Sequence, residues 1–177
     1  MDWLMWVSVA LGALLLAGAI LKIWGFLLPD TVSWSDEVTS NRFYHELKPL
    51  LFQTDSMMAW FPHRQMANQS LTSLLINEKE KTLTARFGNL VQIYQVENWS
   101  VQPPLALSLS THYPLGPYRI SYRLDLTIRS DRAGSVVSVA ESFRIPDPNL
   151  RVGYFRVLKP QYMAMHSDLV QYWSNPS

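Results

Sequence analysis

Hydrophobic positions are distributed unevenly, and the longest apolar segment stands at the beginning of the chain. Residues 3–21 include no charged side chain, and apolar residues resume after Lys22. No polar stripe interrupts the segment, as one would in a helix that packs against a soluble core. Along a helix, Trp3 and Trp24 stand roughly 32 Å apart, which matches the hydrocarbon core of a bilayer with an aromatic residue at each interface. We therefore predict a transmembrane helix over residues 3–28.

Two other interpretations of this segment stay open, a cleavable signal peptide and a buried core helix. A signal peptide begins with basic residues and has a shorter apolar region, whereas this chain carries Asp2 at that place. Three basic residues lie at the end of the segment or soon after it: Lys22, Arg42 and Lys48. The positive-inside rule then favours a cytoplasmic location for the rest of the chain. Acidic residues on the same flank reduce the excess of positive charge on which this orientation depends: Asp30, Asp36 and Glu37.

Beyond this segment the apolar pattern changes to a period of two, which is typical of strands. Residues 31–38 alternate and predict a first strand. Six further strands are separated by short turns, and such connections join antiparallel neighbours. Their expected ranges are 71–76, 82–87, 90–99, 105–113, 118–129 and 135–145. In the fifth of them Ile120, Tyr122 and Leu124 share one face and charged residues the other, so one face of the sheet is covered and the other is solvated.

Three helices are expected beside this sheet. Ser40 or Asn41 caps the first, which continues to about residue 51 and is bent or split at Pro49, and a second covers residues 55–60. The last begins at Pro160, or near residue 152 with a kink at Pro160. Its apolar stripe comprises Tyr162, Met165, Leu169 and Trp173. We assign residues 1–28 to an anchor and residues 29–177 to one α+β domain, in which this helix lies across a curved antiparallel sheet of about seven strands.

Composition excludes several classes of function. The 177 residues carry 15 basic and 14 acidic side chains, so the net charge of +1 gives no general affinity for nucleic acid. The absence of cysteine excludes disulfides, thiolate catalysis and cysteine-ligated metals. The spacing of the histidines is not that of metal ligands: His45, His63, His112 and His166. The sequence also has no nucleotide-binding loop and no serine nucleophile motif. We expect neither a metal nor another cofactor.

Two passages resemble a known superfamily. The segment QVENWSVQPPLALSLS, with Pro103 and Pro104 before a strand, and the final hairpin SDRAGSVVSVAESF resemble the START-like or SRPBCC superfamily over residues 31–174. This helix-grip fold is shared by Bet v 1-type proteins, polyketide cyclases, lipid-transfer domains and coenzyme Q-binding proteins. The resemblance implies a cavity between the sheet and the terminal helix that accepts an apolar molecule. We expect these residues to line it: Trp60, Tyr113, Tyr122, Glu141, Phe143, Tyr162, Met165 and Leu169.

Glu141 is the carboxylate of greatest interest. It shares its parity with Val139 and Phe143, so it points to the covered face and needs a partner there. It is a candidate for orienting a ligand hydroxyl or for acid–base chemistry. Two alternatives stay open: a bulge turns it outward, or it lies at the strand end and pairs with a basic residue such as Arg86.

Residues 114–160 carry an excess of basic side chains, including Arg119, Arg123, Arg129 and Arg132. These arginines form a solvated sheet face or meet anionic headgroups. We predict a membrane-anchored domain that binds a hydrophobic or lipid-like molecule without turnover. One rival is a polyketide cyclase-like enzyme that uses Glu141 with Tyr122 or Tyr162, and the other is a docking factor for a membrane protein partner that binds no ligand.

Overall fold

The computed structural model describes residues 2–62, 65–66, 69–115 and 118–174. The chain begins with helix α1 (Asp2–Leu27) and strand β1 (Thr31–Ser40), followed by helices α2 (Tyr44–Phe52) and α3 (Thr54–Trp60). The remaining strands then follow one another: β2 (Gln65–Met66), β3 (Gln69–Asn77), β4 (Thr82–Phe87), β5 (Leu90–Ser100), β6 (Leu105–Leu115), β7 (Tyr118–Asp131) and β8 (Gly134–Arg144). Helix α4 (Pro148–Gly153), the π-helical turn η1 (Tyr154–Leu158) and helix α5 (Lys159–Ser174) complete the chain.

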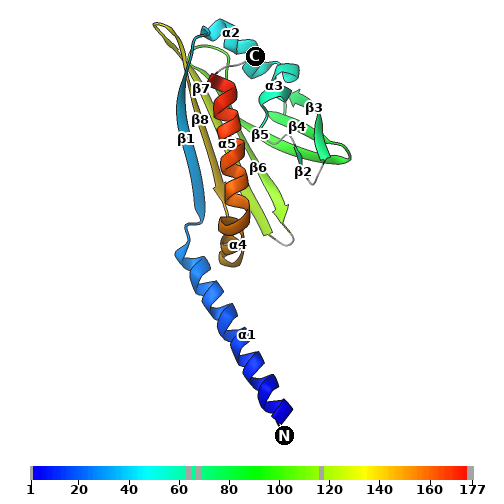
Figure 1. Cartoon of the computed structure of the whole chain (residues 1–177). Helices are drawn as coiled ribbons and strands as arrows, with labels where there is room; N and C mark the ends of the chain where they lie inside the picture. Colours follow the sequence, from blue (N-terminus) through cyan, green and yellow to red (C-terminus); the bar gives the residue numbers. More distant parts are fainter. Residues whose placement is uncertain (1, 63–64, 67–68, 116–117, 175–177) are drawn as a thin grey trace.

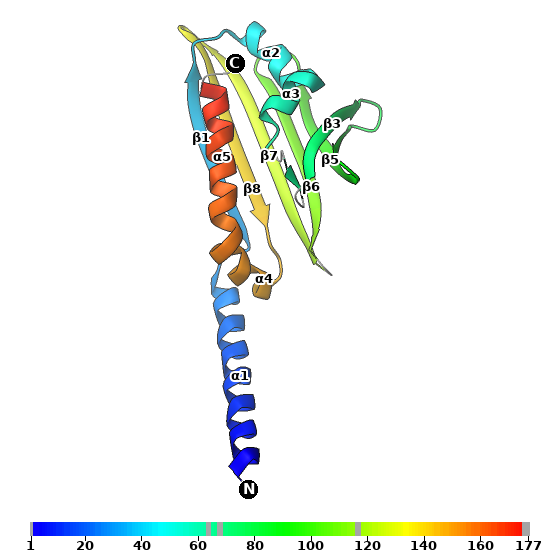
Figure 2. The same cartoon turned by 45° about the vertical axis from the view of Figure 1, so that its right-hand side comes forward.

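The strands form one antiparallel sheet in the order β1-β8-β7-β6-β5-β4-β3-β2. The seven expected strands are all present, and the two-residue β2 is an addition that the pattern does not show. The sheet curves around α5, which lies along its inner face, while α2 and α3 close the end remote from α1 (Figures 1 and 2). The expected helix-grip fold is therefore confirmed.

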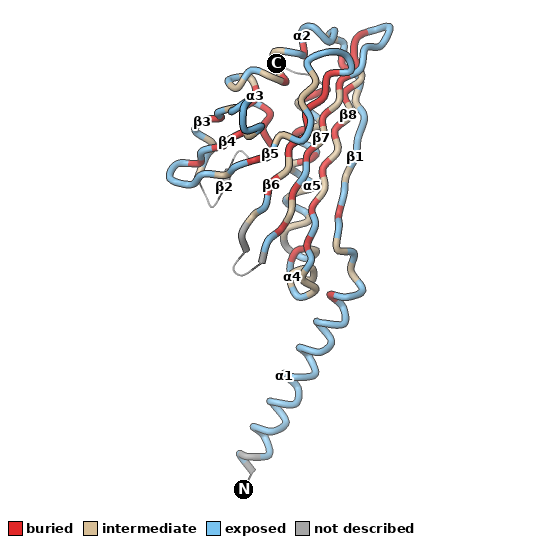
Figure 3. Tube along the Cα trace, turned by 180° about the vertical axis from the view of Figure 1, so that it is seen from behind, coloured by how far each residue is buried: buried red, intermediate tan, exposed pale blue. Residues whose placement is uncertain are grey.

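Alternation explains why β7 and β8 form the centre of the core. On β7, Ile120, Tyr122 and Leu124 are buried, whereas the residues between them are more exposed (Figure 3). Each strand thus presents one face to α5 and one to solvent. The register between β7 and β8 is continuous from Ser121 to Asp131, so no bulge turns Glu141 away from the inner face. The outward bulge considered for Glu141 is wrong.

The beginning of α2 differs from the prediction. Ser40 still belongs to β1, and its hydroxyl accepts a hydrogen bond from the Arg42 amide at 3.3 Å. The first residue outside the helix is Phe43, whose amide donates to the carboxylate of Glu46 at 2.7 Å. Pairing of β1 with β8 continues through Ser40, so strand hydrogen bonds keep this residue out of the capping position. Pro49 does not split α2, because one missing amide removes a single helical hydrogen bond.

The terminal helical segment begins earlier than expected, at Pro148. The Asp147 carboxylate accepts hydrogen bonds from the amides of Asn149 at 2.7 Å and Leu150 at 3.3 Å, which caps α4. The π-helical turn η1 ends directly before α5 and Pro160. Pro160 lacks the amide that a regular helix needs at this place, and a wider turn accommodates that loss.

Helix α1 is long and apolar enough to cross a membrane over Met5–Leu27. Its residues 5–24 are all exposed, and within Met5–Leu27 only Gly25, in the last turn, is buried. Its last turn packs against α4. A side-chain carbon on Gly25 would lie 2.0 Å from the Pro148 carbonyl oxygen, so only glycine allows this approach. The Arg151 guanidinium donates to the carbonyls of Leu28 at 3.1 Å and Ile145 at 2.8 Å. The end of α1 and the domain therefore share one packed junction.

Candidate functional site

Glu141 lies in the middle of β8 on the covered face, as its parity predicts, and only 4% of its surface is exposed. Tyr122 on β7 donates its hydroxyl proton to Glu141 Oε1 at 2.6 Å. Glu141 Oε2 bonds Nδ1 of His166 on α5 at 2.6 Å. The expected alternative partner, Arg86, is wrong: it lies on β4, which β5, β6 and β7 separate from β8. Short bonds of this kind are typical of charge-assisted contacts in a dry interior.

His166 joins two carboxylates through opposite edges of its ring. Its Nε2 bonds Asp36 Oδ2 on β1 at 2.9 Å, and its side chain is only 6% exposed, compared with 57% for Asp36. Each ring nitrogen must donate to bond a carboxylate, so the arrangement favours the imidazolium. Burial lowers the pKa of His166, but the hydrogen bonds and charges of Glu141 and Asp36 together outweigh burial and raise it above 6.5. This cation clasps α5 to β1 and β8.

A group of buried tyrosines continues the polar interior. The hydroxyls of Tyr94 and Tyr113 lie 3.0 Å apart, and the rings of Tyr113 and Tyr122 are 6.1 Å apart. Burial raises the pKa values of Tyr94, Tyr113, Tyr122, Tyr154 and Tyr162, and neighbouring tyrosines add to the effect for most of them. These phenols, which we call the tyrosine cluster, remain protonated at neutral pH. Each can donate a hydrogen bond within an aromatic interior.

Tyr154 differs from the other members of the tyrosine cluster in the surroundings of its hydroxyl. Tyr154 is 2% exposed and its ring lies 6.2 Å from that of Phe143 and 5.8 Å from that of Tyr162. Its hydroxyl has no hydrogen-bond partner among the residues that the structure describes. A buried hydroxyl without a partner costs about 1–3 kcal/mol. The described residues therefore leave this buried donor unsatisfied.

The expected ligand-binding residues fall into two groups. The first group surrounds Glu141: Tyr113, Tyr122, Phe143 and Tyr162, with the Phe143 and Tyr162 rings 4.1 Å apart. Trp60 lies elsewhere, packed against Trp173 with ring centres 5.4 Å apart. Leu169 is a core residue at 2% exposure, and Met165 is only half-buried on α5. The structure thus brings together the aromatic residues around Glu141 and leaves Trp60 outside them.

Sequence reasoning missed His166, Asp36 and Tyr154. The buried residues of α5 are His166, Leu169 and Trp173, and partly buried Tyr162 precedes them, so His166 takes the place expected for Met165. The spacing of four and three residues allowed either choice, and hydrophobicity favoured methionine. Asp36 shares the inward parity of Val32 and Trp34 on β1, which was a usable signal. Nothing in the local pattern marked Tyr154, because a π-helical turn has no regular period.

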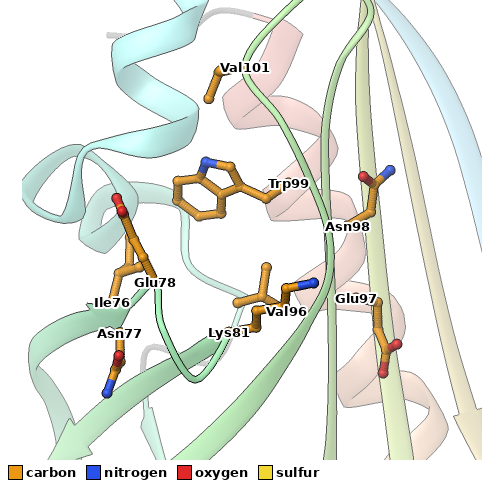
Figure 4. A pocket seen from close by; sticks show the side chains of 9 residues that line it. All are labelled: Ile76, Asn77, Glu78, Lys81, Val96, Glu97, Asn98, Trp99 and Val101. Carbon is orange, nitrogen blue, oxygen red and sulfur yellow. The ribbon is translucent and has the colours of Figure 1, made fainter.

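A hollow lies away from these residues, between the β3–β4 turn and β5. Its volume is about 570 Å³. Figure 4 shows the Trp99 indole at its centre, with Glu78 across from it. The Trp99 ring also packs on Phe52 of α2 at 4.7 Å. The other lining residues are Ile76, Asn77, Lys81, Val96, Glu97, Asn98 and Val101. None of the expected ligand-binding residues borders this hollow.

Two carboxylates and an imidazole meet in the core, yet they do not form a metal site. Within the part of the chain that the structure describes, no group of three or more histidine or acidic side chains is arranged to hold a metal ion. The reason is geometric, because His166 stands between Glu141 and Asp36 and bonds each through a different nitrogen. The three side chains do not converge on one point. What they can do is hold α5 in place and transfer a proton along hydrogen bonds.

Comparison with known proteins gives a fold and no family. No family model and no curated protein matches the sequence. Among solved structures, the hypothetical protein jhp0584 from Helicobacter pylori is 12% identical, with 82% of this chain and 88% of that chain covered and a TM-score of 0.50. XoxI from Bacillus cereus is 13% identical, with coverages of 83% and 97% and a TM-score of 0.49. Ara h 8.0201, of the Bet v 1 family, is 11% identical, with coverages of 80% and 97% and a TM-score of 0.49. At these identities the likeness concerns the fold alone.

Proposed function

We propose that this chain is a membrane-anchored domain that binds an amphipathic, lipid-like molecule between the sheet and α5 and releases it unchanged. Residues 1–28 form the anchor and residues 29–177 the binding domain, on the cytoplasmic side. The observation that carries the proposal is the unpartnered hydroxyl of Tyr154 inside an aromatic interior. A ligand with an apolar body and one carbonyl or hydroxyl oxygen matches both features.

The junction of α1 supports a retained anchor rather than a cleaved signal. The apolar surface of α1 is exposed up to its last turn, and a bilayer would cover it. A signal peptide is removed from the mature protein, whereas Gly25 and Leu28 here take part in the packing and hydrogen bonding of α4 and Arg151. Cleavage would remove these contacts from the folded domain. The excess of basic residues at this junction favours the cytoplasmic side.

The position of Tyr154 supports entry of the ligand from the membrane side. Tyr154 begins η1, the turn that directly follows α4, and α4 contacts the end of α1. Figures 1 and 2 place α4 at the end of the domain next to α1. A molecule that leaves the bilayer therefore meets this end of the tyrosine cluster first. Because α1 tethers the domain to the bilayer, the local concentration of lipid around it is high, and a modest affinity is enough for binding.

Native mass spectrometry of the full chain tests this proposal. Protein is purified from cells and, in parallel, after delipidation, and any adduct is extracted and identified. We expect an apolar adduct that delipidation removes, and a loss of about 3–10-fold in its occupancy in Tyr154→Phe, because one hydrogen bond is lost. The exposed Tyr44→Phe is the matched control and keeps the adduct. A bare protein mass from both preparations would refute binding.

One observation favours a second candidate, an acid–base enzyme of the polyketide cyclase type. The hydrogen bonds from Asp36 through His166 and Glu141 to Tyr122 connect an exposed carboxylate with the interior. Such a chain can accept a proton from a bound molecule at Glu141 and pass one to solvent. This candidate predicts that wild type and Glu141→Gln carry chemically different adducts. Adducts of identical chemical structure, compared after extraction by fragmentation and chromatography, would exclude turnover in the two folded proteins.

A further inference from the structure

Basic side chains gather at the end of the domain that joins α1. Arg151 holds the junction itself, and five more cations lie at the same end: Lys22 on α1, Arg119 at the start of β7, Arg144 at the end of β8, Arg156 on η1 and Lys159 on α5. We call these five residues the basic collar. In the register of β7 and β8, Ser121 is opposite Arg144, so Arg119 lies two residues further along β7 towards the same end of the sheet. That end of the sheet is the one next to α4 and α1 (Figures 1 and 2).

Few acidic groups balance this charge. Among the residues that the structure describes, two lie at this end: Asp30, whose Oδ2 is 3.5 Å from Arg144 Nε, and Asp147, which caps α4. Lys22, Arg119, Arg156 and Lys159 have no ion pair among the residues that the structure describes. On β7, by contrast, Arg123 pairs with Asp125 and Arg129 with Glu37. The end of the domain next to α1 therefore carries more positive than negative side chains.

The packed junction fixes the distance of these cations from a bilayer that α1 crosses. The close approach of Gly25 to Pro148 and the bonds of Arg151 to the α1 carbonyls leave no flexible linker at this place. Arg156 and Lys159 follow Arg151 along the helical segment at about 8 and 12 Å, at about 1.5 Å per residue. The first value equals the Debye length of about 8 Å at physiological salt and the second exceeds it, so a charged surface at the junction attracts Arg156 more strongly than Lys159.

We propose that the basic collar binds anionic phospholipid headgroups and seats the α4 end of the domain on the membrane surface. This inference rests on the anchor in the proposed function and adds a lipid preference to it. Arg119, Arg156 and Lys159 supply most of the attraction, because no acidic partner neutralises them. Phosphate oxygens and negative charge are what unpaired arginine and lysine side chains recognise at a membrane.

Energy transfer to labelled lipids measures this preference in the full chain. The chain has no cysteine, so Gly153→Cys gives one labelling site; Gly153 is exposed, and a side-chain carbon there meets no atom within 4 Å. The labelled protein is placed in phosphatidylcholine vesicles with a trace of acceptor-labelled phosphatidylglycerol or phosphatidylcholine. We expect about fivefold preference for phosphatidylglycerol, which corresponds to about 1 kcal/mol, the contribution of one basic side chain at an anionic surface. At 1 M salt the preference falls towards unity.

Two matched triple variants locate the effect. Arg119→Gln/Arg156→Gln/Lys159→Gln is expected to reduce the preference below about twofold, because three unpaired collar charges are gone. The matched variant Lys48→Gln/Lys79→Gln/Arg132→Gln removes three exposed cations that lie away from this end. It is expected to keep the fivefold preference of the wild type. Equal transfer to both lipids in wild type, or equal loss in both variants, would overturn the inference.

Alkaline carbonate extraction of the same vesicles separates this inference from the anchor. A protein that resists extraction but shows no lipid preference overturns the collar and leaves the anchor intact. A protein that carbonate removes overturns the anchor, and the collar inference with it. Binding of a ligand inside the domain is measured separately, by mass spectrometry. If no ligand is found, the measured lipid preference still decides the inference about the basic collar.

Discussion

Replacing His166 with leucine tests whether the buried cation clasps α5 to the sheet. Its bond to Asp36 reaches a side chain that is 57% exposed, so this pair contributes at most about 1 kcal/mol. Its bond to Glu141 reaches a side chain that is 4% exposed, and removing one partner of a buried ion pair costs about 3–5 kcal/mol. We expect His166→Leu to lose about 3–5 kcal/mol of unfolding free energy, nearly all of it from the unpaired Glu141 carboxylate.

Denaturant and thermal unfolding of the full chain in detergent, followed by tryptophan fluorescence, measure this loss. The expected fall in Tm is roughly 6–20 °C for a domain of this size. Asp36→Asn is the control for the exposed bond and loses no more than about 1 kcal/mol.

The double variant His166→Leu/Glu141→Gln distinguishes a buried charge from lost packing. Glutamine keeps an acceptor for the Tyr122 hydroxyl and removes the negative charge, so most of the loss is recovered, about 2–3 kcal/mol. If His166→Leu costs less than about 1 kcal/mol, the clasp is not what holds α5. If the added Glu141→Gln restores nothing, the loss comes from packing, and the electrostatic reasoning is refuted.

Three further predictions follow from named contacts. The pKa of His166 is raised on folding, so its protonation stabilises the fold fully below pH 6.5, and this contribution is lost as the pH rises through the folded-state pKa. The unfolding free energy measured between pH 6 and 9 should show this loss in wild type and not in His166→Leu. Gly25→Leu places a side chain where a first carbon already lies 2.0 Å from the Pro148 carbonyl oxygen, so amide exchange in α4 should accelerate at least tenfold while that of β7 stays constant; unchanged exchange in α4 would show that the junction is not packed. Asp147→Ala removes two hydrogen bonds from the start of α4 and should cost about 0.5–2 kcal/mol in unfolding experiments, whereas Asp168→Ala, at an exposed position, should cost nothing measurable.

The sequence alone determined the apolar first helix, the strands and the inward direction of Glu141. Each of these depends on a local pattern, an uninterrupted apolar run for the helix and a period of two for the strands, which the side chains of one segment reveal without their neighbours. The uninterrupted apolar run gave α1, and the alternation in residues 118–128 gave the covered face of β7. Element order then supplied the helix-grip fold, because short turns leave few ways to connect antiparallel strands.

Only the tertiary structure decided which partners meet inside the domain. Asp36 and His166 are separated by 130 positions and Arg151 and Gly25 by 126, so no local pattern connects them. His166 rather than Met165 is buried on α5 because the Glu141 carboxylate lies opposite it. A histidine is buried at low cost only where such a partner bonds its ring nitrogens. Burial of polar groups is a property of pairs, and a pair exists only once the chain has folded.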